Sequence, residues 1–494
     1  MPKAKKQHFD VLIIGAGISG IGMACHLQMD SPEKSFAILE RRDAIGGTWD
    51  LFNYPGIRSD SDMFSFGYSF RPWQEPKVLA DGPSIREYVV KTAREYNVEE
   101  KIQFGLKVTD AAWSSADACW TVTAEQEATG ETRQYSCNFL ILGTGYYRYD
   151  KGYMPDFPGM DKFKGELIHP QLWPKDLDYS GKRVVVIGSG ATAMTLIPAM
   201  AKDTAHITML QRSPSYIVSL PAFDAISAKM QKYLPKDLVF KMARKRNIAL
   251  QRAQYVMARK YPNVMRRLLL WGVQKHLGDD FDMRHFTPSY DPWDERLCAV
   301  PSGDLFKVLR SGEASVVTDH IEKFTKDGIK LKSGETLEAD IIISATGLHM
   351  QMMGDLHITI DGEHRAVNEV MTYKSVLVEG VPNMATVFGY TNASWTLKAD
   401  IAAEYVCRLL NHMDAKGYRS ATPHDEEDSA EDSSVMGALN SGYVKRAADR
   451  MPRQGKKLPW RVLNHYKRDQ EMLLEEPIED GILEFETKAR KKAA

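Results

Sequence analysis

The sequence is poor in cysteine and has no long apolar run. Its five cysteines are scattered through 494 residues, and none lies in a Cys-x-x-Cys pair. Their odd number and wide spacing argue against a disulfide framework, a zinc ribbon and a dithiol reductase, so no metal site is predicted and a reducing, cytoplasmic location is favoured. No stretch reaches the ~18 uninterrupted apolar residues that a membrane-spanning helix needs.

The chain also lacks an excess of either charge. It has 64 Lys and Arg against 65 Asp and Glu, which gives a net charge of -1. This balance provides no global attraction to nucleic acid, and no nucleic-acid partner is expected. The apolar content of 43% is ordinary for a globular protein, and 494 residues are enough for two or three domains with large cores.

The first recognisable motif is a glycine-rich turn near the N-terminus. A continuous apolar run, 9–15, predicts a buried parallel strand, and the turn Gly15-x-Gly17-x-x-Gly20 leads from it into a helix. In such a turn the first glycine permits the bend, the second lets the backbone approach a pyrophosphate, and the third lets the helix pack on the sheet. The next strand ends in Glu40, where an acid would bind ribose hydroxyls. Together these residues predict a dinucleotide site.

A second turn of the same kind follows an apolar strand at 183–188. It reads Gly188-x-Gly190-x-x-Ala193, with alanine in a place where the pattern allows it. The paired strand ends in Arg212 and Ser213 and not in an acid. An arginine here can stack on adenine and bind a 2′-phosphate, so the second site is predicted to take NADPH. The alternative is that Arg212 is a plain surface charge.

Two longer strings have ordinary interpretations when each is taken alone. The stretch 163–174 contains Phe163, Gly165, His169 and Trp173, and its prolines exclude a continuous helix; it could be an irregular connector whose aromatic residues pack. The stretch 46–60 combines a Gly-Gly turn with a Tyr-Pro-Gly turn, and its last residue, an aspartate, could be a turn or helix cap.

Taken together, the two strings resemble the two long fingerprints of the type I Baeyer–Villiger monooxygenases. Residues 163–174 match FxGxxxHxxxWP and residues 47–60 match GxWxxxx[FY]PGxxxD, both without departure. The resemblance extends over roughly residues 8–485, and the runs 46–63 and 389–400 are most similar to the ethionamide-activating monooxygenases of mycobacteria and their bacterial relatives. It implies an α/β fold with two Rossmann-like domains, one for FAD and one for NADPH.

The same resemblance implies roles for individual residues. The loop with Gly47, Thr48 and Trp49 would lie along the flavin, and Trp395 would lie against NADP, although a capping turn followed by core packing explains Trp395 equally well. Arg296 takes the place of the catalytic arginine, Asp60 that of the acid which orients it, and His169 that of the histidine that shifts the enzyme between its half-reactions. Glu295 departs from the family pattern, which has a lysine before the catalytic arginine, and leaves the recognition of NADPH to Arg212.

The implied reaction is a Baeyer–Villiger oxidation. NADPH would reduce FAD, oxygen would add to the flavin as a C4a-peroxyflavin, and one oxygen atom would enter a ketone beside its carbonyl to give an ester. Sulfides or thioamides would be further substrates. A cation such as Arg296 can stabilise the peroxide anion and a developing oxyanion, and FAD supplies the difficult oxygen chemistry.

The organisation expected from these motifs is discontinuous. The FAD domain is predicted at 1–150 and 375–494, the NADPH domain at 175–225 and 290–350, and a connector at 151–174. The polar stretch 423–434 is expected to be a loop.

A helical insertion is predicted at 226–289. Within it, ten Lys or Arg and no acid occur between 241 and 275, interleaved with apolar residues at helical spacing. A solvated basic face and a peripheral membrane or partner surface both fit this pattern. The oligomeric state stays open, with a homo-oligomer among the options.

Three other classes of protein compete with this interpretation. A flavin monooxygenase that oxygenates sulfur or nitrogen would keep the glycines and His169 but would not need Arg296 with Asp60. A disulfide reductase would need the missing cysteine pair. A non-catalytic nucleotide-binding protein would explain the glycines and the insertion but not both long strings.

Overall fold

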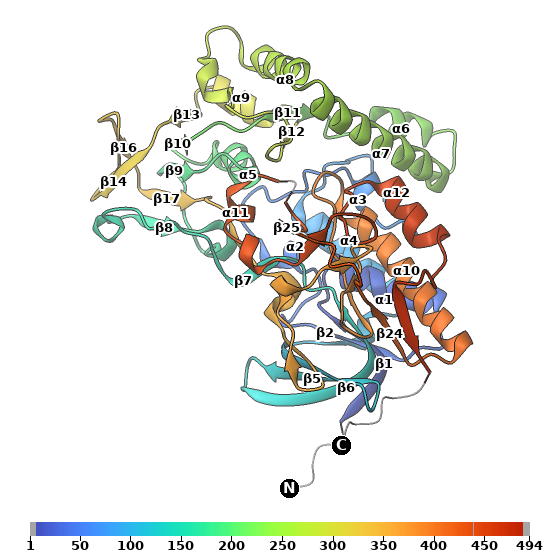
Figure 1. The fold of residues 1–494 in the computed structure, drawn as a ribbon. Helices are drawn as coiled ribbons and strands as arrows, with labels where there is room; N and C mark the ends of the chain where they lie inside the picture. Colours follow the sequence, from blue (N-terminus) through green and yellow to red (C-terminus); the bar gives the residue numbers. More distant parts are fainter. Residues whose placement is uncertain (1–5, 438, 488–494) are drawn as a thin grey trace.

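The computed structural model describes residues 6–437 and 439–487, and its largest element is an eleven-stranded mixed sheet (Figure 1). The main path of this sheet has the order β20-β19-β4-β5-β6-β1-β2-β3, and β23 pairs with β6 beside it. The strands on this path are β1 (Gln7–Ile14), β2 (Phe36–Leu39), β3 (Ile102–Gln103), β4 (Leu106–Ser114), β5 (Cys119–Gln126), β6 (Glu131–Leu142), β19 (His357–Ile360) and β20 (Glu363–His364). Off it lie β21 (Thr372–Tyr373), β22 (Leu377–Val378) and β23 (Met384–Thr386).

One half of this sheet is parallel and fully covered. β1 pairs in parallel with β2 and β6, and β23 continues the parallel arrangement on the other side of β6. Val11, Leu12 and Ile13 of β1 have no exposed surface, because α1 (Ile18–Asp30), α4 (Gly82–Glu95) and α10 (Trp395–Lys416) and the remaining strands cover both faces. Burial on both faces explains the continuous apolar run that predicted this strand.

The other half is antiparallel. β4 and β5 form a hairpin, and β5 pairs with the first part of β6. Buried and less buried side chains alternate along both hairpin strands, as the sequence predicted for residues 108–113 and 120–124. β6 therefore belongs to both halves of the sheet and directs its C-terminal end toward the glycine-rich turn.

A second, all-parallel sheet has the order β13-β10-β9-β17-β8. It consists of β8 (Glu166–Ile168), β9 (Arg183–Ile187), β10 (His206–Gln211), β13 (Ala314–Thr318) and β17 (Ile341–Ser344), and it packs against α5 (Ala191–Met200) and α9 (Asp304–Arg310). The expectation of a wholly irregular connector at 163–174 is wrong in one respect. Its residues 166–168 become the edge strand β8, because Ile168 can bury its side chain in the core of this sheet.

The chain crosses between the two sheets as a two-stranded ribbon. The outgoing strand β7 (Tyr147–Gly152) pairs antiparallel with the returning strand β18 (Leu348–Met350). Each crossing therefore supplies the backbone hydrogen-bond partners of the other.

The insertion is helical, as predicted. It contains α6 (Ala225–Met230), α7 (Lys236–Lys260) and α8 (Pro262–Leu277), which lie along the upper edge of the molecule in Figure 1. α7 ends before Pro262, and this proline occupies the first turn of α8, where its missing N–H is tolerated. Beneath α8, β11 (Ile217–Leu220) pairs with β12 (Cys298–Pro301). No helix in the described part of the chain is long and apolar enough to cross a membrane.

The expected loop at 423–434 is present at residues 424–429, but both ends of the stretch form strands. Residues 430–434 form β25 (Ala430–Ser434), which pairs with β26 (Arg453–Gly455), and residue 423 ends β24 (Ser420–Pro423), which pairs with β27 (Leu483–Glu486). Pairing with β26 at Ala430 and Ser434 draws the second part of this polar stretch into a strand, although its side chains resemble those of a loop.

Candidate functional site

A cavity of about 660 Å³ lies between the carboxyl ends of the parallel strands of the first sheet and the N-terminus of α5 beside the second sheet. The predicted site residues that line it are Gly15, Gly17, Glu40, Gly47, Thr48, Trp49, Asp60, Arg296 and Trp395. The others, Gly20, His169, Gly188, Gly190, Ala193, Arg212 and Ser213, lie outside this wall, although the second sheet contributes Ala191, Thr192 and Thr195 of α5. The cavity thus brings residues from distant parts of the chain together.

The first glycine turn is closely packed. Gly15 has a φ of +100°, and a Cβ there would lie 2.7 Å from the carbonyl oxygen of Gly143. A Cβ on Gly20 would lie 1.9 Å from the carbonyl oxygen of Gly15. Gly17 caps α1 without any side chain that accepts a hydrogen bond from the first turn, so the N–H groups of this turn are open toward the cavity. An open helix N-terminus of this kind favours a phosphate.

Glu40 is held in place beside this turn. Its carboxylate accepts hydrogen bonds from the backbone N–H groups of Ala16 (2.6 Å) and Arg42 (2.8 Å). Burial raises the pKa of Glu40 in spite of these two donors. The remaining acceptor positions of the carboxylate can take ribose hydroxyls, which is the role predicted for this residue.

The loop 46–60 closes over the first turn and also contacts the second sheet. A Cβ on Gly47 would lie only 2.9 Å from the Cα of Gly17, so the two glycine backbones meet. Thr48 and Trp49 begin α2 (Thr48–Leu51) on the cavity wall. Arg58 forms a 2.7 Å ion pair with Asp304 of α9 and thereby fixes this loop to the second sheet, a contact that the sequence analysis missed.

Arg296 lies among aromatic side chains and forms no ion pair with Asp60 among the described residues. Its Nε is buried without a hydrogen-bond partner. Burial by itself lowers the pKa of Arg296, but Tyr443, Tyr146, Tyr147 and Asp60 together raise it above the ordinary value. The guanidinium is therefore a permanent cation, and no described residue accepts a hydrogen bond from its Nε.

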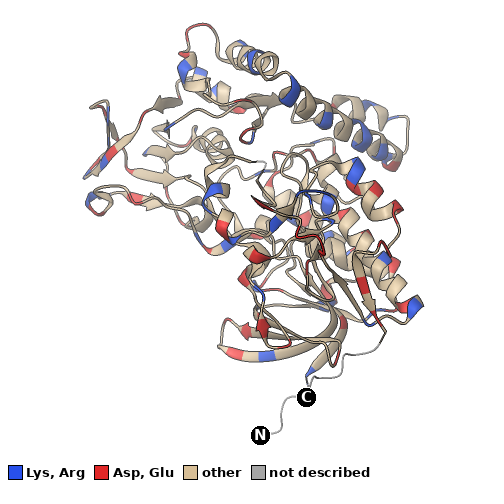
Figure 2. Cartoon of the chain, in the orientation of Figure 1, with Lys and Arg blue, Asp and Glu red and all other residues tan. Residues whose placement is uncertain are grey.

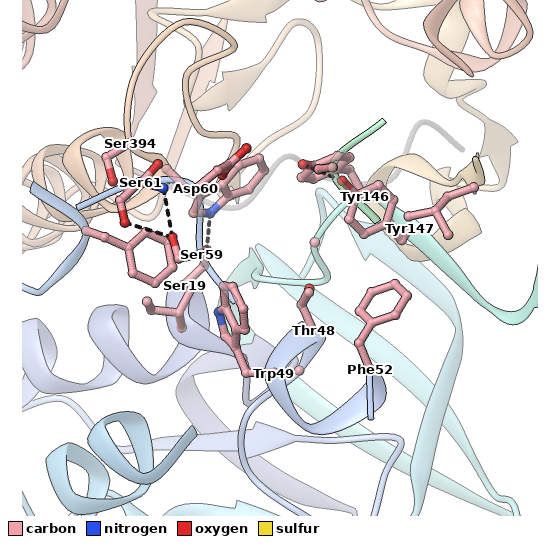
Figure 3. Close-up of a pocket in the computed structure, with 18 of the residues that line it drawn as sticks. Ser19, Thr48, Trp49, Phe52, Ser59, Asp60, Ser61, Tyr146, Tyr147 and Ser394 are labelled. Carbon is pink, nitrogen blue, oxygen red and sulfur yellow. Dashed lines mark hydrogen bonds between the residues drawn. The ribbon is translucent and has the colours of Figure 1, made fainter. Parts of the chain in front are cut away.

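Two tyrosines on the cavity wall were not anticipated. Figure 3 shows Tyr146 and Tyr147 on one side of the cavity and Asp60 with Ser59 and Ser61 on the other. The Tyr147 hydroxyl donates to that of Tyr146 at 2.8 Å, and Tyr146 stacks on Trp395 with ring centroids 4.8 Å apart. Their position directly after a buried strand and a Thr-Gly turn was the signal that could have indicated them, since ligands bind at the carboxyl ends of parallel strands.

Trp395 connects α10 to the first glycine turn. Its indole N–H donates to the hydroxyl of Ser19, one residue inside α1, at 2.8 Å. Both interpretations from the sequence therefore have support, because Trp395 lines the cavity and also packs in the core around it.

The second glycine turn is more open than the first. Gly188 has a φ of +133°, and a Cβ there would lie 2.4 Å from the carbonyl oxygen of Ala345, whereas Gly190 has no atom within 4 Å of such a Cβ. Arg212 and Ser213 are exposed at the end of β10, and the Ser213 carbonyl accepts a hydrogen bond from the side chain of Ser189 in this turn. Arg212 thus lies beside the turn, as the predicted role requires.

His169 follows β8, packs against the ribbon at Gly152 and Gly347, and does not lie on the cavity wall. Its Nε2 is 3.0 Å from the carbonyl oxygen of Gly347, and its Nδ1 accepts the N–H of Gln171 at 3.2 Å. The Gln171 side chain in turn donates to the carbonyls of Arg148 and Tyr149 in β7. The 163–174 string therefore contacts both chain segments that cross between the sheets, β7 and the residue before β18. Gln171 is a functional candidate that the motifs did not indicate.

These residues fit two dinucleotides. The uncapped N-terminus of α1, the closely approaching backbones of Gly17 and Gly47, and the fixed carboxylate of Glu40 form a phosphate and ribose cradle in the first sheet. Gly190 caps α5 without a side-chain partner and gives the second sheet a similar cradle. The fold and site together define a flavoprotein with two dinucleotide-binding regions.

Comparison with known proteins gives the family. Residues 8–387 match the flavin-binding monooxygenase-like family, and the chain belongs to it. MymA of Mycobacterium tuberculosis is 61% identical over 99% of both chains, and EthA of Mycolicibacterium smegmatis, an FAD-containing monooxygenase, is 53% identical over 97% of both. The prediction of a flavin monooxygenase is confirmed.

Solved structures with bound FAD or NADP share the fold. A steroid monooxygenase bound to NADP has a TM-score of 0.76 at 22% identity, covering 94% of this chain and 97% of its own. The monooxygenase OTEMO in complex with FAD and NADP has a TM-score of 0.70 at 22% identity, covering 85% and 88%. The α/β fold predicted from the two glycine-rich turns is confirmed.

Proposed function

We propose that this flavin monooxygenase carries out Baeyer–Villiger oxidation with FAD, NADPH and O₂. One oxygen atom of O₂ enters the bond between the carbonyl carbon and the α-carbon of a ketone and gives an ester. The other leaves as water, and NADPH supplies the two electrons. FAD, when bound, supplies the hydride acceptance and the oxygen activation that no side chain can perform.

The observation that carries this proposal is the position of Arg296. It is a permanent cation on the cavity wall, its Nε has no partner, and the same wall contains the first glycine turn. A fixed cation stabilises negative charge that develops on oxygen, including the oxyanion that forms when a ketone carbonyl is attacked. Hydride transfer from NADPH does not need this charge.

The other residues hold and orient the reactants. The turn Gly15–Gly20 and Glu40 would bind FAD, and Gly188, Gly190, Ala193, Arg212 and Ser213 would bind NADPH. Asp60 acts on Arg296 through the field of its charge, since no ion pair joins them. Trp395 and Tyr146 stack on each other and form an aromatic part of the wall that also contains Arg296.

A second activity, the oxygenation of sulfides or thioamides, is compatible with the same site. Electrophilic transfer to sulfur creates no oxyanion on a carbonyl, so it depends less on Arg296. An enzyme that oxygenates only sulfur or nitrogen is the competing function. A panel of ketones and sulfides followed by product mass spectrometry distinguishes the two functions, because only the first proposal yields esters.

Substitution of Arg296 tests the proposal directly. In Arg296→Ala, NADPH is expected to bleach the flavin anaerobically at close to the wild-type rate, whereas the ester yield per NADPH falls about 10²–10³-fold and hydrogen peroxide is released in air. Arg296→Lys should keep part of the yield, and Asp60→Asn should lose less than Arg296→Ala. Stopped-flow absorbance and product analysis give both readouts. Ester formation by Arg296→Ala at wild-type coupling would reject the role.

A further inference from the structure

The outer face of the helical insertion is unusually apolar. Sixteen large apolar side chains are exposed in the described part of the chain, and thirteen of them lie between residues 223 and 271. Tyr233 is 80% exposed, Trp271 63% and Ile226 61%. Isolated exposed apolar residues are ordinary, but a concentration of this kind marks an interaction surface.

These side chains follow the helical repeat. On α8, Val264, Leu268 and Trp271 are exposed at spacings of four and three residues, and Lys275 continues this stripe. The Lys275 ammonium lies 5.2 Å from the centre of the Trp271 ring. A stripe in which apolar residues are flanked by lysine matches helices that lie in the interface of a lipid bilayer.

α7 repeats this arrangement. Leu238, Met242 and Val256 are exposed on the face that also carries Lys245 and Lys260, since all five positions fall within one sector of the helix. The opposite face of α7 is anchored. Arg244 donates to the carbonyls of Phe64 and Gly67 and lies 3.2 Å from a carboxylate oxygen of Asp400.

Ion pairing separates the basic residues of the insertion into two groups. Arg244, Arg246 and Arg259 form ion pairs with acids, and Arg266 contacts Tyr216 and Tyr290. Within the described chain no ion pair engages Lys241, Lys245, Arg252, Lys260, Arg267 or Lys275. In Figure 2, Lys and Arg are blue and recur along both α7 and α8. Asp237 in the first turn of α7 is the one acid within α6–α8, and residues 238–278 contain none. A surface with so few balancing acids attracts an anionic partner.

The inner faces of the same helices reach the cavity. Gln251 and Gln254 of α7 and Met265 and Leu269 of α8 line it. Met265 and Leu269 lie one turn apart, beside the exposed stripe of α8. One helical pair therefore has an apolar, basic outer face and an inner face that forms part of the cavity wall.

We propose that the outer face of α6–α8 docks on an anionic lipid bilayer, from which apolar substrates reach the cavity. The charge of this face fits anionic headgroups, and its exposed tyrosine, tryptophan and aliphatic side chains fit the boundary between headgroups and acyl chains. Docking itself does not depend on the reaction, and only the delivery of a substrate rests on the proposed function.

Binding is tested with the FAD-loaded enzyme and sedimenting vesicles. The wild type should bind vesicles that contain phosphatidylglycerol, bind pure phosphatidylcholine far less, and be released by high salt. The triple variant Lys245→Glu, Lys260→Glu, Arg267→Glu should bind at least about a hundredfold more weakly, because each basic residue near an anionic surface contributes roughly fivefold. The control changes three exposed lysines of another region without ion pairs, Lys323, Lys326 and Lys332, to Glu and should bind like the wild type.

The apolar contribution has its own pair of variants. Leu268→Gln with Trp271→Gln should weaken vesicle binding, whereas Met29→Gln, which changes an exposed apolar residue at the far end of α1, should not. Flavin content and turnover of a water-soluble ketone without vesicles should stay unchanged in all of these variants. A lipid-dissolved ketone should be turned over more slowly only by the insertion variants.

Several outcomes would overturn docking. The first is equal binding of the wild type to both kinds of vesicle, and the second is binding that the insertion variants do not reduce. The third is a wild type that does not bind vesicles but forms an oligomer, which the Trp271 variant dissociates. The last would assign the surface to a second copy of the chain. A wild-type enzyme that binds vesicles but forms no ester from any ketone would instead reject the proposed function and leave docking intact.

Discussion

The two glycine-rich turns have almost the same sequence pattern but different surroundings. Around the first, Gly20 is buried against Gly15, the Gly47 backbone closes over Gly17, and Trp395 is bound to Ser19. Around the second, Gly190 is exposed, a Cβ there would meet no atom within 4 Å, and Arg212 is exposed beside it. One turn is enclosed by other parts of the chain, and the other faces open space.

This difference corresponds to two ways of using a dinucleotide. An enclosed cradle has most of its contacts in place before binding and suits a cofactor that stays bound through many turnovers. An open cradle suits a cosubstrate that must enter and leave in each cycle. We expect this comparison to hold for FAD in the first turn and NADPH in the second.

The largest expected effect comes from adding one methyl group to each turn. Gly15→Ala forces a side chain into a φ of +100° and against the Gly143 carbonyl at 2.7 Å, so it should cost at least ~2 kcal/mol and abolish retention of FAD. Gly188→Ala, the matched change at the second turn, meets the same strain (φ of +133° and 2.4 Å from the Ala345 carbonyl oxygen) but should keep full flavin and raise only the KM for NADPH. The ratio of flavin to protein absorbance measures the difference, and circular dichroism must show both variants folded. A folded Gly15→Ala with full flavin would break the comparison.

A smaller effect is expected at the open turn. Arg212→Gln removes a cation placed to bind a 2′-phosphate. The substitution should raise the KM for NADPH about tenfold to a hundredfold, a loss of ~1.5–3 kcal/mol of binding free energy, and should leave the KM for NADH unchanged. Glu295→Gln should act in the opposite direction, because Glu295 lies within the field of Arg212. Steady-state kinetics with both coenzymes measure the shift. Equal losses with NADH and NADPH would mean that Arg212 does not recognise the phosphate.

The smallest effect concerns the ribbon that joins the two regions. Burial lowers the pKa of His169, and its Nδ1 accepts an N–H, so the neutral ring is the form that the folded site holds. As pH falls below the ordinary histidine pKa of about 6.5, the unfolded chain binds a proton that the folded chain does not, and stability falls. The Tm of the wild type should therefore decrease more between pH 7 and 5.5 than that of His169→Gln. Parallel Tm profiles would show that His169 does not contribute.

Much of the fold could be predicted from the sequence because it depends on local patterns. Continuous apolar strands and the glycine turns after them each reflect a short-range requirement. Predictions failed where long-range pairing decided the structure. Residues 166–168 became a strand only because β17 offers a partner, and residues 430–434 only because β26 does.

The candidate site divides in the same way. Motifs indicated the glycines, Glu40, the 46–60 loop and Arg296, since each belongs to a contiguous string. They did not indicate that Tyr146 stacks on Trp395, or that Arg58 bridges to Asp304, because these partners are far apart in the chain. The roles assigned to individual residues, and the domain boundaries drawn from the motifs, stay predictions.

The class of this protein follows from local sequence patterns, because phosphate-binding turns and the two long strings need particular residues at short, fixed spacing. How those parts act together depends on the tertiary structure. It placed His169 against the crossings and not in the cavity, surrounded Arg296 with tyrosines in place of an ion pair, and turned one face of α7 and α8 inward and the other outward. Each of these outcomes depends on packing between segments that lie far apart in the chain, and no local pattern encodes such packing.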